Sequence, residues 1–140
     1  MGKQEKLKAQ KRAERQAENL KAWRIDVRPY PISIVSIDED GKMETEDGRP
    51  IMVEDEFDVK GSLAAILFNP TLQLKPQEGF EAHDLAKKIR AADGHVILDS
   101  RERGMVTRAY EALRGVTENQ IEFLRRISEA EEVTMEEAKD

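Results

Sequence analysis

Two short stretches bring together side chains that could carry acid–base or nucleophilic chemistry. His83 is followed by Asp84, and the stretch DGHVILDS contains His95, Asp99 and Ser100. A catalytic serine needs a strained turn with its base in reach, and Ser100 lacks the Gly-x-Ser-x-Gly context that supplies one. Asp99 and Ser100 instead precede an apolar-periodic segment, where both residue types cap helices. We therefore predict no catalytic residue and a non-enzymatic protein, against the alternative of an enzyme built around His95 and Asp99.

The sequence offers no recognisable set of metal or cofactor ligands. It has no cysteine and two histidines, whose spacing matches no compact zinc pattern. The carboxylates between Asp38 and Asp58 lack the regular spacing of an EF-hand loop, so a solvated acidic hairpin is expected there. There is no glycine-rich phosphate loop and no dinucleotide fingerprint. The sequence therefore predicts no metal, no cofactor and no small-molecule substrate.

The feature that points to binding is the charge of the N-terminus. Residues 1–28 contain nine Lys or Arg and four acids, a formal charge of +5 in a chain whose total is −6. Residues 29–140 therefore carry −11. This asymmetry indicates an arm with a partner of its own. Within the basic arm, which we define as residues 1–24, we predict seven partner-binding residues: Lys8, Lys11, Arg12, Arg15, Leu20, Trp23 and Arg24.

One possible partner of the basic arm is a nucleic acid. In favour of this partner, basic side chains on a helix neutralise phosphates. Against it, acidic residues are interspersed among the lysines and arginines of the arm. Its longest unbroken basic run is Lys11-Arg12, shorter than is common in nucleic-acid arms. Nucleic-acid binding would also need the arm to share one continuous face with later arginines: Arg101, Arg103 or Arg108.

The second possible partner is a protein. On a helix, a thin alanine stripe would end in Leu20 and Trp23, and large apolar groups of this kind anchor protein interfaces. Because the rest of the chain is acidic, the arm could also reach a neighbouring copy. We favour docking on a protein or self-association, with nucleic-acid binding as the alternative and a solvated, partnerless helix as the third interpretation.

The basic arm and the following domain differ in composition. Residues 3–24 are mostly good helix formers without Gly or Pro, so one helix is expected there. Pro29 and Pro31 remove backbone donors and force extended geometry, which ends any helix before them. We therefore place a domain boundary between the arm and residues 25–140.

The first part of the predicted domain is a short antiparallel meander. β-Branched residues and two Asp-Gly-type turns set its outline, and residues 38–58 hold ten acids against two bases. Its predicted strands are 32–37, 42–46 and 51–53.

About four helices follow the meander. Apolar spacing and capping residues predict them from Asp58, from Phe80, after the Asp99–Glu102 capping box and after the Thr117–Gln120 capping box. A short buried strand is expected at Val96–Leu98, Tyr110 and Leu113 are expected in the core, and the acidic tail from Glu129 is expected to fray. The sequence therefore predicts an α+β fold with a basic helical arm, a short antiparallel β-meander and about four further helices.

Three further stretches carry a resemblance to a known class of proteins. EFDVKGSLAAILFNP, LAKKIRAADGHVILDS and GVTENQIEFLRRISEAEEV, within residues 56–133, resemble small accessory proteins of tailed bacteriophages. The resemblance implies a small non-enzymatic virion or host-interaction factor, and it transfers no site residues. The N-terminus lacks the apolar segment of a secretory signal, and no run approaches the ~20 apolar residues of a membrane span. We therefore expect no membrane contact and a cytoplasmic location, in the host cell or the virion if the chain is phage-encoded.

Overall fold

The computed structural model describes the backbone of residues 2–19 and 21–135 and the side chains of residues 2–12 and 21–135. It is an α+β fold with a leading helix, as predicted. The helices of the described part are α1 (Lys3–Asn19), α2 (Val59–Ile66), α3 (Pro76–Ala91), α4 (Ser100–Glu111) and α5 (Ile121–Ser128), with two 3-10 turns, η1 (Pro70–Leu72) and η2 (Glu118–Gln120). Its strands are β1 (Lys21–Asp26), β2 (Tyr30–Val35), β3 (Thr45–Glu46), β4 (Arg49–Pro50), β5 (Met52–Phe57), β6 (His95–Leu98) and β7 (Glu131–Thr134).

Strand β1 is the centre of a three-stranded antiparallel sheet. It pairs with β6 along one edge and with β7 along the other. Trp23 lies opposite Leu98 on one side and Glu132 on the other. Ala22 and Ile25 of β1 are fully buried. The sheet thus joins three segments that are distant in the sequence, and it needs β1 to hold the other two together.

The core forms where helices α2 to α5 pack together and against β1 and β6. Helices α2 and α4 begin at their predicted caps. Asp58 accepts a hydrogen bond from the Gly61 N–H at 3.0 Å, and Asp99 accepts one from the Glu102 N–H at 2.8 Å. The largest fully buried side chains are Phe123, Ile25, Leu63, Ile89, Leu98, Ile127, Val27, Val59, Val96 and Val106.

Strands β2 and β5 form a two-stranded ribbon, which we call the acidic ribbon (residues 30–57). Its register runs from Tyr30 opposite Phe57 to Val35 opposite Met52, so the strands are antiparallel as predicted, although β2 pairs with β5 rather than with the next strand along the chain. A small hairpin of β3 and β4 continues it. Asp47 and Gly48 turn this hairpin with φ of 52° and 77°, the positive values that tight hairpin turns require.

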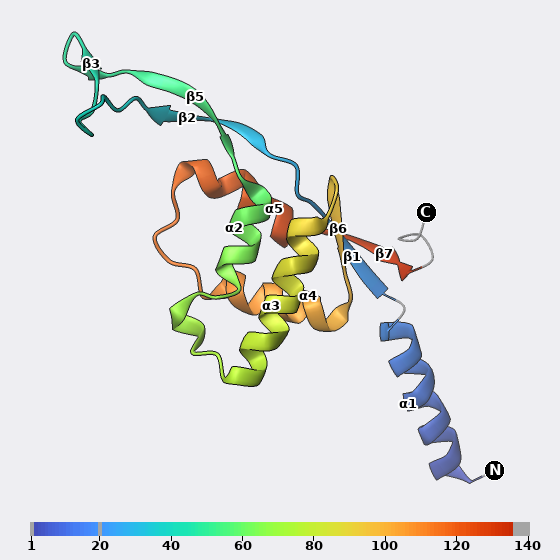
Figure 1. Ribbon diagram of the computed structural model, residues 1–140. Helices are drawn as coiled ribbons and strands as arrows, with labels where there is room; N and C mark the ends of the chain where they lie inside the picture. Colours follow the sequence, from blue (N-terminus) through green and yellow to red (C-terminus); the bar gives the residue numbers. More distant parts are fainter. Residues whose placement is uncertain (1, 20, 136–140) are drawn as a thin grey trace.

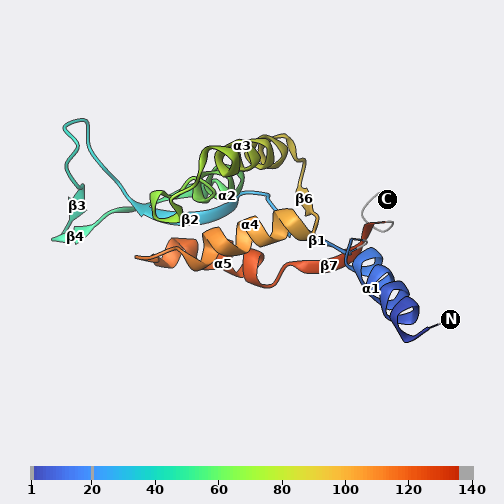
Figure 2. The ribbon, with the colours of Figure 1, turned by 90° about the horizontal axis from the view of Figure 1, so that it is seen from below.

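The two charged segments leave the body at opposite ends. Figure 1 shows α1 projecting from one end, beyond β1 and β7, while the acidic ribbon extends from the other end past α2 and α5. The view turned by 90° in Figure 2 agrees, with the β3–β4 tip and α1 at the two extremes of the molecule. The fold is therefore a small body with two projecting elements.

The predicted helix over residues 3–24 is wrong in its last part. Helix α1 ends at Asn19, and residues 21–24 belong to β1. Local propensity favours a helix through Lys-Ala-Trp-Arg, but pairing with β6 and β7 overrides it because both partners come from far along the chain. The sequence-based domain boundary after residue 24 falls inside this strand.

Three smaller expectations also needed correction. Helix α3 begins at Pro76, four residues before Phe80, and the Phe80 side chain is exposed. Leu113 is half-buried and lies beyond the end of α4, although Tyr110 does pack on the core. Residues 131–134 of the acidic tail form β7, because Val133 is buried opposite Ala22.

Deleting parts of the N-terminus should separate the arm from the body. A protein that lacks residues 2–19 should still fold, because it loses α1 and keeps all of β1. Deletion of residues 2–24 should abolish cooperative unfolding, since the β1 residues that pair with β7 are lost. Circular dichroism melting of both proteins tests this, and a cooperative transition in the longer deletion would contradict it.

Candidate interaction surfaces

Helix α1 presents an exposed basic surface. Five of its six basic residues have described side chains, and these five are exposed and form no ion pair with another described residue: Lys3, Lys6, Lys8, Lys11 and Arg12. Leu7 is 53% exposed. A helix places side chains four residues apart on one face, so Leu7 lies between Lys3 and Lys11. This face combines an apolar group with two cations.

The other predicted partner-binding residues lie elsewhere. Arg15 is in α1, and its side chain is not described; Leu20 lies outside the described residues. Trp23 and Arg24 are in β1. The guanidinium of Arg103 stacks 5.9 Å from the Trp23 ring centre, and Arg24 pairs with Glu131 at 3.5 Å. Trp23 and Arg24 therefore make contacts within the body and are not part of the α1 surface. Of the predicted residues, Lys8, Lys11 and Arg12 lie together on that surface.

The acidic ribbon is a second surface that sequence patterns indicated only in part. Its 28 residues hold nine acids and two bases, a formal charge of −7. Within the described chain, every ion pair joins residues of the body, and none includes a ribbon carboxylate. The ribbon also exposes large apolar side chains, with Ile37 at 64%, Met43 at 54% and Met52 at 53%. The ribbon thus combines carboxylates that form no described ion pair with apolar side chains that are exposed to solvent.

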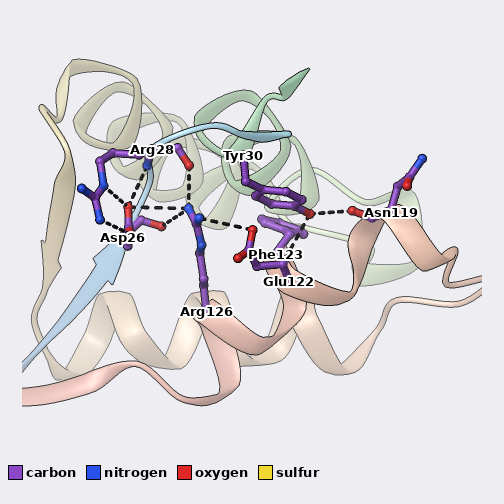
Figure 3. Close-up of polar contacts among 7 residues, drawn as sticks. All are labelled: Asp26, Arg28, Tyr30, Asn119, Glu122, Phe123 and Arg126. Carbon is purple, nitrogen blue, oxygen red and sulfur yellow. Dashed lines mark hydrogen bonds and ion pairs between the residues drawn. The ribbon is translucent and has the colours of Figure 1, made fainter. Parts of the chain in front are cut away.

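The root of the ribbon is fixed to α5 through Tyr30. Its hydroxyl donates to the Asn119 carbonyl at 2.5 Å and accepts from the Phe123 N–H at 3.2 Å (Figure 3). The Tyr30 ring stacks on Phe57 with centroids 4.9 Å apart, and Phe57 in turn contacts Phe123 at 5.4 Å. Burial raises the pKa of the Tyr30 phenol, so it remains a donor at neutral pH. These hydrogen bonds and ring contacts therefore fix the root of the ribbon against α5.

Asp26 organises the turn between β1 and the ribbon. Its carboxylate accepts from the Arg28 side chain at 3.0 and 2.8 Å and lies 3.6 Å from Arg126. Arg126 also donates to the Arg28 carbonyl at 2.5 Å, as Figure 3 shows. The hydrogen bonds from Arg28 hold the pKa of Asp26 well below its usual range. This cluster fixes the direction in which the chain leaves β1.

The three later arginines that nucleic-acid binding would need, Arg101, Arg103 and Arg108, contact groups of the body itself. Arg101 pairs with Glu81 at 3.3 Å, and Arg108 with Glu78 at 2.8 Å, which lowers the pKa of Glu78. Arg103 donates to the Ile127 carbonyl at 2.8 Å. Their side chains therefore neutralise or cap groups of the fold. They do not extend the basic surface of α1.

The histidines lie apart from one another. His83 is exposed on α3. His95 lines an open cleft of about 570 Å³ beside Arg24 and Asp26, whereas the Asp99 carboxylate caps α4. Among the described residues, no group of three or more His, Asp or Glu side chains is arranged to hold a metal ion.

Comparisons with known proteins found no matching family, curated protein or solved structure. In the described part of the chain, no helix is both long and apolar enough to cross a membrane. The candidate site therefore rests on the two projecting surfaces: the basic face of α1, part of which the charge pattern predicted, and the acidic ribbon.

Replacing Tyr30 with Phe should loosen the ribbon root. The change keeps the ring stacking but leaves the buried Phe123 N–H without its acceptor. We expect the free energy of unfolding to fall by about 1–3 kcal/mol. Chemical denaturation measures this, with Tyr110→Phe as control because no described contact uses its hydroxyl. Equal stability of Tyr30→Phe and wild type would show that the root does not depend on this hydroxyl.

The Asp26 cluster predicts a pH-dependent loss of stability. A carboxyl group whose pKa is lowered by folding stabilises the fold above its unfolded pKa of about 4, and this contribution declines as pH falls below it. Asp26→Asn should cost about 1.5–3 kcal/mol at pH 7, and the difference from wild type should shrink below about pH 4. Denaturation from pH 7 to pH 2.5 tests this, with the exposed Asp93→Asn as control. A difference independent of pH would contradict it.

Proposed function

We propose that this chain is a non-enzymatic interaction or assembly protein that docks on protein surfaces through α1. The observation that carries the proposal is the basic surface of residues 3–12 in α1, whose side chains form no ion pair with another described residue and surround the exposed Leu7 on a helix that projects from the body. Cations around an apolar group suit an acidic protein surface, where charge guides encounter and the apolar contact holds the complex.

The contacts of Arg101, Arg103 and Arg108 within the body favour a protein over a nucleic acid as the partner of α1. A nucleic-acid surface would gain from a continuous row of cations along the backbone. Arg101 and Arg108 are paired with glutamates, and Arg103 stacks on Trp23. The chain also carries the acidic ribbon, which would repel phosphates. Nucleic-acid binding by α1 is therefore the competing outcome of the test.

The resemblance to small accessory proteins of tailed bacteriophages suggests the biological context of this proposal. A virion or host-interaction factor would work in the cytoplasm of the host cell or inside the particle. Docking through a projecting helix suits either place, because the body stays folded while α1 engages its partner.

Capture from extracts of the source cells, with and without nuclease, tests the proposal. Wild type should retain proteins that survive nuclease treatment, and deletion of residues 2–19 should release them. The double variant Lys8→Ala/Arg12→Ala should weaken retention, mainly at low salt, because rim charges are screened. The matched control is Lys87→Ala/Arg90→Ala, which removes one lysine and one arginine from the exposed surface of α3.

Two results would contradict the proposal. Retention that vanishes with nuclease would show that α1 binds nucleic acid. Equal retention by the deletion and by wild type would show that α1 is not the docking element.

A further inference from the structure

One face of the acidic ribbon is apolar at its centre and has no covering layer. Val35 pairs with Met52, and Ile37 bridges to Met43. Paired residues point to the same side, and so do residues two apart in a strand. Val35 and Met52 therefore share a face of the ribbon, and the exposed Ile37 and Met43 form an isolated bridge just beyond the end of β2. We call these two neighbouring pairs the ribbon patch: Val35, Ile37, Met43 and Met52.

The ribbon patch lies between acids. Glu54 and Glu56 continue the same face of β5 toward the body, by the same two-residue repeat. Toward the tip, residues 38–47 add six acids. Two-stranded ribbons without a packing layer are marginally stable in water. A partner that covers this face should therefore be apolar at its centre and cationic on either side.

Helix α1 has this complementary pattern. Leu7 lies between Lys3 and Lys11 on one face, with roughly 6 Å of helix rise between successive members. On the ribbon, Met52 and Glu54 are roughly 7 Å apart along β5. When Leu7 covers Met52, a lysine of α1 therefore comes beside Glu54, and the other lysine faces the acidic tip.

We propose that the ribbon patch of one molecule binds α1 of a second copy of this chain. The inference rests on the proposed function, since it names the surface on which α1 docks. Within one molecule the contact cannot form, because α1 and the ribbon lie at opposite ends of the body in both views (Figures 1 and 2). Both surfaces have uncompensated charge of opposite sign, while the ion pairs of the described residues are confined to the body.

Such a contact joins two different surfaces of the same chain. A single contact of this kind repeats from copy to copy and produces chains or closed rings, and two antiparallel copies satisfy both contacts at once. In each case the association depends on the same two surfaces. Its strength should fall with salt because exposed charges are screened over about 10 Å at 0.1 M.

Paired charge reversals test the proposal in sedimentation velocity over a range of protein concentrations and salt. One variant carries Lys3→Glu/Lys11→Glu on α1, and the other carries Glu54→Lys/Glu56→Lys on the ribbon. Each should associate at least about tenfold more weakly than wild type, because like charges now face each other. An equimolar mixture should recover association, since each reversed surface then finds the reversed surface of the other variant.

Two further proteins complete the test. Leu7→Ser should also weaken association without changing charge, and Lys87→Glu/Arg90→Glu on α3 should leave it unchanged. Circular dichroism checks that each variant is folded. Recovery in the mixture supports the proposal.

Wild type that stays monomeric at every concentration, or a mixture that stays monomeric, would overturn the self-docking inference. If α1 is then still required to capture other proteins after nuclease treatment, the proposed function stands and the inference alone fails.

Discussion

The arrangement of the molecule depends on the pairing of β1 with two strands at once. The two ends of an extended strand point in opposite directions, and six residues of strand span roughly 20 Å. Helix α1 precedes β1 and the acidic ribbon follows it after a short turn. Because β6 and β7 fix β1 along both edges, α1 and the ribbon must leave the body at opposite ends. The Asp26 cluster and the Tyr30 hydroxyl then set the direction of the ribbon.

Charge is distributed according to this arrangement. In the body, exposed cations such as Arg101 and Lys88 lie beside carboxylates, with Lys88 2.7 Å from Glu102. On α1 and the ribbon, one sign of charge predominates and the described side chains form no ion pairs. An exposed ion pair such as those of the body contributes little to the free energy of folding, so stability does not require such pairs on α1 or the ribbon. Uncompensated charge on projecting elements instead favours encounter with a partner of opposite sign.

Local sequence signals predicted the helices well. Capping residues such as Asp58, Asp99 and Thr117 act between neighbours in the chain, so their pattern is visible without the fold. Strands β1 and β7 were missed because their stability comes from pairing across more than a hundred residues. The same limit applies to the candidate site. The charge of α1 is evident in the sequence, but the place of Trp23 in β1, stacked with Arg103, and the projection of the ribbon follow from tertiary contacts.

The claim that connects the two projecting elements is that α1 of one molecule binds the acidic ribbon of a second copy. A projecting helix lacks the tertiary packing from which helices in proteins gain most of their stability, and an uncovered ribbon is marginal in water, so the amides of both should exchange quickly in the monomer. Hydrogen–deuterium exchange of wild type at rising protein concentration tests the claim directly. The account predicts that protection increases together in residues 3–19 and 33–54, while β1 and α2 to α5 are unchanged. Unchanged protection in both segments, or new protection confined to the body, would contradict it.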